Sequence, residues 1–168
     1  MKPFTIFGIL PLLIFLFSAN EKTPDQSSVY IESDIQWQAL EEAQYLAKED
    51  NKPLFIFVEA EWCGTCKAML REVFPQENVL EEVQNFHLVS IDVDSRKEVT
   101  FNGESLTERE FAQAMQVQGT PTMIFVDSGG EVMGRQSGFM DAEELTKLLR
   151  YVRSDQFGEV PFSEFDPG

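Results

Sequence analysis

Two cysteines separated by two residues are the feature of this 168-residue sequence most suited to chemistry. They stand in Trp62-Cys-Gly-Thr-Cys66, between an apolar run and a stretch with helical periodicity. Unpaired N–H groups and the helix dipole stabilise a thiolate at the start of a helix, so Cys63 is the candidate nucleophile. Cys66 follows nearly one turn later on the same side, close enough for a disulfide. The pair predicts dithiol–disulfide exchange, with Cys66 resolving the mixed disulfide that Cys63 forms.

The alternatives for this cysteine pair are a static disulfide, two buried thiols, or half of a zinc site completed by a second chain. A helix seldom needs such a bridge, and the position between a strand and a helix favours redox chemistry. Two cysteines and one histidine cannot build a disulfide scaffold, nor a four-ligand zinc site from Cys and His alone. We therefore expect no metal and no organic cofactor.

The charge of the chain argues against two classes of partner. Thirteen Lys and Arg against 29 Asp and Glu give a formal net charge of -16, which repels phosphate backbones and argues against nucleic-acid binding. The same charge disfavours docking on anionic lipid headgroups. Hydrophobic residues at 43% and charged residues at 25% are typical of globular proteins, and the length suits one compact domain with tails.

The first segment has the composition of a targeting sequence. One Lys follows the initiator Met, and no charge appears from 3 to 20, where the residues are mostly apolar. Residues 1–19 are predicted to be a signal peptide or a retained N-terminal anchor, followed by a leader over 20–32. A hydrophobic helix of the domain itself is the remaining alternative. Export predicts a periplasmic or otherwise extracytoplasmic location, where an oxidising environment gives a cysteine pair redox work.

The elements that must position the cysteines follow from periodicity and from capping residues. Ser33 to Gln36 reads as a capping box, so a helix is expected from there to about Glu49. Further along the chain, Thr107 and Asp141 are predicted to cap two more helices. The other expected elements are a buried strand 54–58, a helix 63–73, a helical piece 77–84, a buried strand 87–93, a loop or small insertion 94–105, and two strands 123–126 and 131–135.

This order predicts an α/β fold with a mixed central sheet of about four strands, helices on both faces and an extra N-terminal helix. The domain is expected to span 33–154. The residues after it, 155–168, include Pro, Gly and acids, and they are predicted to form a flexible acidic tail.

Two segments resemble thioredoxin-like proteins. Ala60 to Lys67 resembles their active-site segment, and Gly119 to Thr122 resembles their cis-proline loop. The resemblance implies a thioredoxin fold with Pro121 in the cis form and Thr120 contacting the partner peptide. Without it, Pro121 would be a turn before a strand. Ser137 to Glu143 is similar to the C-terminal domain of DsbD, whereas the long loop before the third helix is more similar to the SoxW-like periplasmic thioredoxins.

The sequence departs from that family at one position. Thioredoxins and the DsbD domain carry a buried Asp six residues before the first cysteine, and Phe57 stands there in this chain. Glu59 has the same strand parity, so it is a candidate proton acceptor, with a solvated acid at a strand end as the alternative. Trp62 is expected to shield the active site, or else to be part of the core.

The resemblance implies an exported thiol:disulfide oxidoreductase that reduces disulfides in exported proteins. Its electrons would come from a membrane thiol transporter, and we expect a monomer that contacts the membrane only through an N-terminal anchor. The same-class alternative is a disulfide oxidase or isomerase. A redox-inactive module that uses the thioredoxin groove to bind partners is the alternative from a different class.

Overall fold

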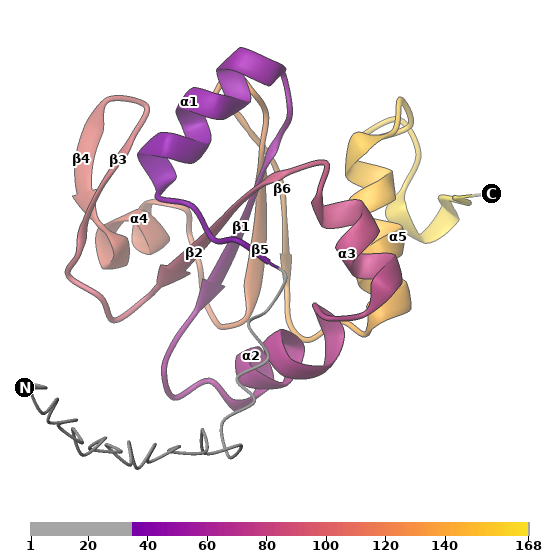
Figure 1. Cartoon of the computed structure of the whole chain (residues 1–168), viewed down its shortest axis with the longest axis horizontal. Helices are drawn as coiled ribbons and strands as arrows, with labels where there is room; N and C mark the ends of the chain where they lie inside the picture. The colour runs from indigo at the N-terminus through magenta and orange to yellow at the C-terminus, as the bar shows by residue number, and fades with distance from the viewer. Residues whose placement is uncertain (1–34, 168) are drawn as a thin grey trace, which may run out of the picture. The chain divides into compact units, whose positions relative to one another are not determined.

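The computed structural model describes residues 35–167, which are built around a four-stranded mixed sheet (Figure 1). Its strand order is β2-β1-β5-β6. β1 (Leu54–Glu59) pairs parallel with β2 (His87–Asp92) and antiparallel with β5 (Thr122–Val126), which pairs antiparallel with β6 (Val132–Ser137). All five residues of β5 are buried, as are the first five of β1, as expected for central strands covered on both faces.

Helices cover both faces of this sheet. The helical elements are α1 (Leu40–Asp50), α2 (Gly64–Ala68) with a π-helical continuation (Met69–Val73), α3 (Glu77–Val83), α4 (Glu108–Ala114) and α5 (Ala142–Arg153). A short 3-10 helix (Phe162–Glu164) lies in the C-terminal segment. Leu54, Ile56 and Val58 pack with α1 and α4, whereas Phe55 and Phe57 pack with α2, α3 and α5. This alternation along β1 separates two core clusters and confirms the predicted fold class.

The predicted start of the first helix is wrong. α1 begins at Leu40, and Ile35 to Ala39 run without helical structure. The N–H of Gln38 donates to the carbonyl of Leu88 at 2.8 Å, so this segment satisfies a backbone group on the sheet's edge strand. Ile35 is nevertheless buried. Ser33, the expected cap, lies outside the described residues.

The polar segment after β2 contains a small insertion. β3 (Glu98–Phe101) and β4 (Glu104–Thr107) form an antiparallel hairpin that packs beside α1 and α4 (Figure 1). Its turn is Asn102-Gly103, and both residues have positive φ, as a two-residue hairpin turn requires. The side chain of Gln44 on α1 donates to the carbonyl of Thr100 at 2.7 Å and accepts from the N–H of Asn102 at 2.9 Å.

The predicted caps of the last two helices are confirmed. Thr107 accepts from the N–H of Glu110, and Asp141 accepts from the N–H of Glu144, with both reciprocal side-chain bonds present.

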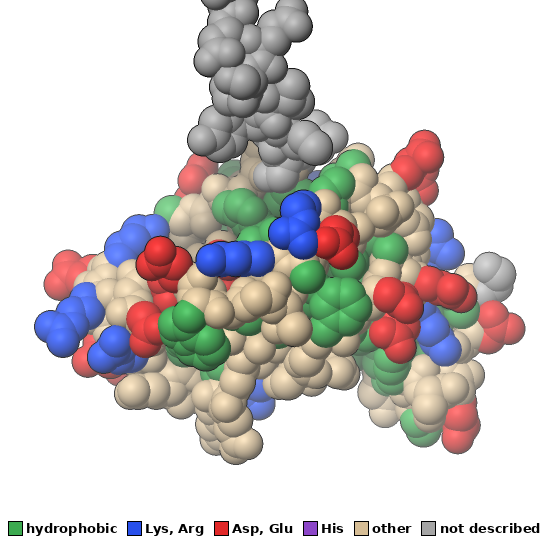
Figure 2. Space-filling model, turned by 90° about the horizontal axis from the view of Figure 1, so that it is seen from below, with side chains coloured by type: hydrophobic (Ala, Val, Ile, Leu, Met, Phe, Trp, Pro, Cys, Tyr) green, Lys and Arg blue, Asp and Glu red, His purple; other side chains and the backbone are tan. Residues whose placement is uncertain are grey.

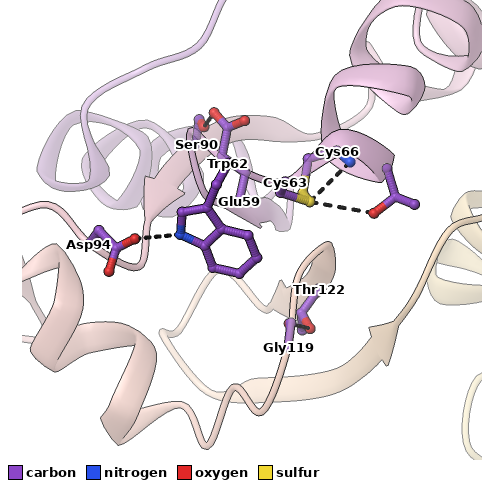
Figure 3. The surroundings of a disulfide bond; sticks show 9 residues. Glu59, Trp62, Cys63, Cys66, Ser90, Asp94, Gly119 and Thr122 are labelled. Carbon is purple, nitrogen blue, oxygen red and sulfur yellow. Dashed lines mark hydrogen bonds between the residues drawn. A yellow bond between two sulfur atoms is a disulfide. The ribbon is translucent and has the colours of Figure 1, made fainter.

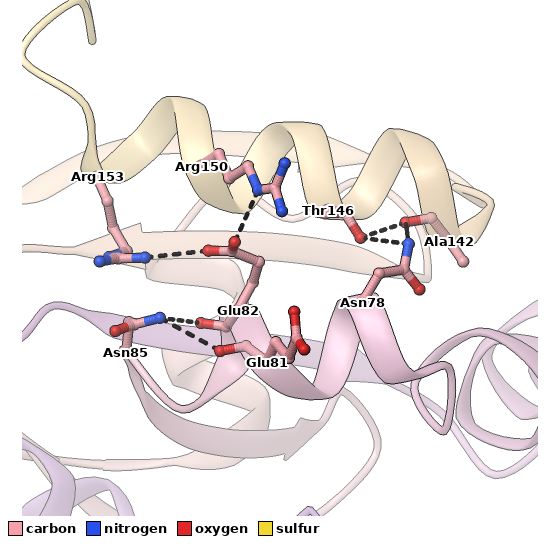
Figure 4. A network of polar contacts seen from close by, with 8 residues as sticks. All are labelled: Asn78, Glu81, Glu82, Asn85, Ala142, Thr146, Arg150 and Arg153. Atoms are coloured by element: carbon pink, nitrogen blue, oxygen red, sulfur yellow. Dashed lines mark hydrogen bonds and ion pairs between the residues drawn. The ribbon is translucent and has the colours of Figure 1, made fainter. Parts of the chain in front are cut away.

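Polar contacts join α3 to α5 (Figure 4). Glu82 accepts hydrogen bonds from Arg150 at 2.7 Å and Arg153 at 3.0 Å, and Asn78 donates to Thr146 at 2.9 Å. These contacts hold α3 and α5 together on the face of the sheet that α2 also covers.

The C-terminal segment, predicted to be a flexible acidic tail, makes contacts with α5 in the residues that the structure describes. Residues 155–167 fold back onto α5, because Tyr151 offers both a ring and a hydroxyl. The rings of Phe157, Phe162 and Phe165 lie 5.1–5.5 Å from the Tyr151 ring, centroid to centroid. The Tyr151 hydroxyl donates to the carbonyl of Val160 at 2.7 Å, and Phe165 is buried. Within 35–167, no helix has the length and apolar character needed to cross a membrane.

Candidate functional site

A disulfide joins Cys63 and Cys66 at the start of α2, with the two Cα atoms 5.3 Å apart (Figure 3). Cys63 is the N-cap residue and has extended backbone geometry, while Cys66 lies inside the first turn. Both cysteines are buried, Cys63 at 3% exposure and Cys66 at 0%. The predicted proximity of the two sulfur atoms is therefore present in the fold.

The Cys63 sulfur accepts two hydrogen bonds from its own helix turn. The backbone N–H of Cys66 donates to it at 3.1 Å, and the hydroxyl of Thr65 lies 3.5 Å from it. A sulfur in a disulfide carries no hydrogen, so the Thr65 hydroxyl is the donor. Donors aimed at one sulfur favour negative charge there after the disulfide opens.

The loop before β5 lies in the surroundings of the disulfide (Figure 3). The Thr120–Pro121 peptide bond is cis, and the Thr122 hydroxyl donates to the carbonyl of Gly119 at 2.7 Å, which closes the loop. Pro121 is buried. The Thr120 hydroxyl is buried without a hydrogen-bond partner among the described residues. The cis form implied by the resemblance is thus found in the structure.

Trp62 stands beside the disulfide with 70% of its surface exposed, so it is not a core residue. Its indole N–H donates to Asp94 at 2.7 Å (Figure 3). Arg109 contacts the same Asp94, donating to its backbone carbonyl at 3.1 Å and lying 3.5 Å from its carboxylate. The indole is therefore fixed from one side while its ring faces solvent.

Phe57 occupies the position six residues before the first cysteine, where thioredoxins carry a buried acid, and its ring packs in an aromatic cluster. Phe57 is fully buried, with its ring centroid 6.1 Å from Trp37 and 5.1 Å from Phe74. Glu59 follows two residues later and is half-buried. Its carboxylate points toward Ser90 on β2, whose hydroxyl donates to it at 2.9 Å (Figure 3).

A second exposed aromatic side chain lies near the cis-proline loop. Phe139 is 49% exposed, and the N–H of the preceding Gly138 donates to the carbonyl of Pro121 at 2.9 Å. Exposed aromatic surface is therefore found at Trp62 beside the disulfide and at Phe139 next to a residue bonded to the cis-proline loop. The described residues hold no cluster of three His, Cys, Asp or Glu side chains suited to a metal ion.

Three polar residues at the site were not predicted: Thr65, Ser90 and Asp94. A signal for two of them exists in the sequence, because the carboxyl ends of neighbouring parallel strands meet at one edge of a sheet. β1 and β2 are such neighbours, in register from Leu54 with His87 to Glu59 with Asp92. Polar residues near the end of the second strand could therefore be expected near those that end the first.

Comparison with known sequences agrees with this geometry. The thioredoxin-like domain family matches residues 40–153. The thiol:disulfide interchange protein DsbD of Pasteurella multocida (strain Pm70) is 27% identical over 156 residues, covering 90% of this chain and 25% of that protein. The chain spans only 16–25% of the length of the curated DsbD relatives compared.

Solved structures show the same fold. A thioredoxin from Thermus thermophilus superposes with a TM-score of 0.59 at 29% identity, covering 74% of this chain and 90% of that one. The oxidised C-terminal domain of Neisseria meningitidis DsbD superposes with a TM-score of 0.56 at 22% identity, covering 67% and 91%. Because the family model matches residues 40–153, more than half of the chain, the chain belongs to the thioredoxin-like domain family.

Proposed function

We propose that this chain is a thiol:disulfide oxidoreductase that exchanges the Cys63–Cys66 pair with disulfides of protein partners. The observation that carries the proposal is the disulfide at the start of α2, in the surroundings of a cis-proline loop. The names of the DsbD relatives support the reaction class. The direction we propose is reduction of disulfides in exported proteins.

The proposed cycle starts from the dithiol. The Cys63 thiolate attacks one sulfur of a partner disulfide, which forms a mixed disulfide and releases the other partner sulfur as a thiolate that takes up a proton. Cys66 then loses its proton and attacks the Cys63 sulfur, which releases the second partner thiol. Two electrons pass to the partner, and the Cys63–Cys66 disulfide is restored. A dithiol donor must reduce it again, and we propose a membrane thiol transporter for this step.

The proton of Cys66 needs an acceptor, and we propose Glu59 for this role. Glu59 ends β1 just before the cysteine segment, on the same strand and of the same parity as Phe57. Half-burial and the hydrogen bond from Ser90 hold its carboxylate in one place. An acceptor at the end of this strand would receive the proton directly or through one water molecule.

Partner binding is proposed at the loop and at the two exposed aromatic residues. Thr120 and Pro121 would contact the partner backbone, while the exposed rings of Trp62 and Phe139 would supply apolar contact surface. The face that carries α2 shows hydrophobic side chains among acidic and basic ones (Figure 2). Residues 1–19, which lie outside the described residues, would direct the protein to an extracytoplasmic compartment. We propose that the protein acts there as a monomer.

Trapping tests the proposal. Cys66→Ser leaves Cys63 able to attack but removes the resolving thiol, so covalent complexes with partner proteins should accumulate in the native compartment and dissolve on addition of dithiothreitol. The matched control, Cys63→Ser, keeps Cys66 and should trap no partner. Equal capture by both variants would refute the assigned roles. Capture by neither, with wild-type function retained in Cys63→Ser, would indicate a redox-inactive binding module.

A further inference from the structure

Trp62 is the most exposed of the large hydrophobic side chains among the described residues, and a polar contact holds it. With 70% of its surface exposed, it has little packing to fix its ring. Its indole N–H donates to Oδ2 of Asp94 at 2.7 Å, and a hydrogen bond to a charged group is a strong one (Figure 3). The orientation of the ring beside the disulfide therefore depends on where the Asp94 carboxylate is held.

Asp94 lies in the exposed segment after β2, and Arg109 on α4 is its second partner. The Arg109 guanidinium donates to the backbone carbonyl of Asp94 at 3.1 Å and lies 3.5 Å from its Oδ1. Trp62 uses Oδ2, so the two oxygens of the carboxylate have different partners. Arg109 thus restrains both the backbone and the side chain of Asp94.

The start of α4 keeps its place without the Arg109 side chain. The backbone N–H of Glu108 donates to the carbonyl of Lys97 at 2.9 Å. Glu108 is 6% exposed, and its carboxylate accepts from the N–H of Asp92 at 3.2 Å and lies 3.5 Å from the Lys97 ammonium. Truncation of the Arg109 side chain should therefore leave this backbone in place and release the hold on Asp94.

We propose that Arg109 is a positioning residue for partner binding, because it holds Asp94 and thereby keeps the Trp62 indole in one orientation beside the disulfide. A ring that is already fixed loses less conformational entropy when it packs against a partner chain, and this raises affinity. Arg109 acts through Asp94 and Trp62 and takes no part in the exchange of sulfur atoms. The inference rests on the proposed function, since Trp62 is proposed there as a contact surface for partners.

Three substitutions separate the contact with Asp94 from a change of charge alone. Arg109→Met removes the guanidinium and keeps an unbranched apolar side chain, whereas Arg109→Lys keeps a cation that can pair with the carboxylate. Arg96→Met removes the same charge from an exposed position in the segment after β2, so it is the matched control.

Two kinds of measurement follow the binding and the ring. The first is kcat and KM for reduction of insulin disulfides, with dithiothreitol as electron donor, compared with the rate for oxidised glutathione as a small disulfide. The second is the hydrogen exchange rate of the Trp62 indole N–H by NMR. Trp62→Phe identifies that signal, because Trp37 is the only other tryptophan in the chain.

We expect Arg109→Met to raise the KM for insulin about three- to tenfold with kcat within about twofold, because a large side chain is no longer fixed before binding. Oxidised glutathione offers no extended chain to pack on the ring, so its rate should change less than about twofold. The Trp62 indole N–H should exchange faster in Arg109→Met. Arg109→Lys should recover most of both effects, and Arg96→Met should stay within about twofold of the wild type.

An unchanged insulin KM in Arg109→Met, or equal increases in Arg109→Met and Arg96→Met, would overturn the inference. An unchanged exchange rate of the Trp62 indole N–H would do the same, because Arg109 would then not restrain the ring. The proposed function fails separately, when the wild type reduces neither insulin nor oxidised glutathione, and the binding role of Arg109 falls with it. A wild type that reduces both beside an unchanged Arg109→Met variant refutes the role of Arg109 alone.

Discussion

The proposed proton transfer at the cysteine pair requires a carboxylate near Cys66. Phe57 fills the position at which thioredoxins hold an acid, so an acid there is replaced by a ring packed against Trp37 and Phe74. Glu59 lies one strand repeat further on, beside Ser90. The chain thus keeps an acid at the end of β1 while making the strand interior wholly apolar.

Substituting Glu59 tests this arrangement at the residue scale. Glu59→Gln keeps the shape and the hydrogen bond from Ser90 but removes the proton acceptor, so reduction of a protein disulfide should slow by about 10- to 100-fold. The measurement is the rate of oxidation of the reduced protein by a disulfide substrate. Glu61→Gln, which removes an exposed acid two residues away, is the control and should change the rate less than twofold. Equal rates in the two variants would refute Glu59 as the acceptor.

Among the secondary-structure elements, β1 is central to the site, because it leads into the cysteine segment and contributes side chains to both core clusters. Its even-numbered residues pack under α1 and α4, and its odd-numbered phenylalanines pack under α2, α3 and α5. An aromatic cluster around Phe57 thus supports the helix on which the disulfide stands. Rigid support of this kind keeps reacting atoms in place.

The stability of this element can be measured with Phe57→Ala. Removing a fully buried phenyl ring leaves a cavity, so the free energy of unfolding should fall by about 3–5 kcal/mol in denaturant titrations. Tyr45→Ala, which removes an aromatic ring that is 64% exposed on α1, should change it by less than about 0.5 kcal/mol. A loss of similar size in both variants would contradict the packing described for β1.

The cap of α4 predicts a pH dependence. The backbone N–H of Thr107 and then its hydroxyl donate to Glu110, which holds the pKa of that carboxyl below its usual 4.5. A lowered pKa stabilises the fold fully above pH 4.5, and that contribution disappears as the pH falls through the folded value. The wild type should therefore exceed Glu110→Gln in thermal midpoint at neutral pH and lose this advantage in acid. A difference that grows in acid would contradict the cap.

For the molecule as a whole, the order of helices and strands along the chain, the mixed sheet and the cysteine pair could be predicted, because buried runs and caps are local signals. Two features could not be predicted in this way. The N–H of Gln38 pairs with Leu88, fifty residues away, and this long-range contact overrides a local helix signal. The aromatic residues of the C-terminal segment are apolar anchors hidden in an acidic composition. Asn102-Gly103, in contrast, was a readable hairpin signal within a segment expected to be a loop or small insertion.

Substitutions of two phenylalanines on different parts of the molecule should affect different properties, stability in one case and substrate binding in the other. Phe165 is 5% exposed against Tyr151, so Phe165→Ala should lower the free energy of unfolding by about 2 kcal/mol and leave disulfide exchange unchanged. Phe139 is half exposed near the cis-proline loop, so Phe139→Ala should leave stability nearly unchanged. It should raise the KM for a protein disulfide several-fold, with no effect on reduction by dithiothreitol. Kinetics and denaturant titrations of both variants check this, and a reversed pattern would contradict both assignments.

The central claim is that Cys63 and Cys66 form a redox-active pair, and its most direct test is the reduction potential of the soluble domain. Equilibration in dithiothreitol or glutathione buffers should give one reversible two-electron transition. A value near the thioredoxin potential of about -270 mV agrees with the proposed reductase, whereas one near the DsbA value of about -120 mV would reverse the proposed direction. A correctly folded domain whose disulfide shows no reversible transition would contradict the claim itself.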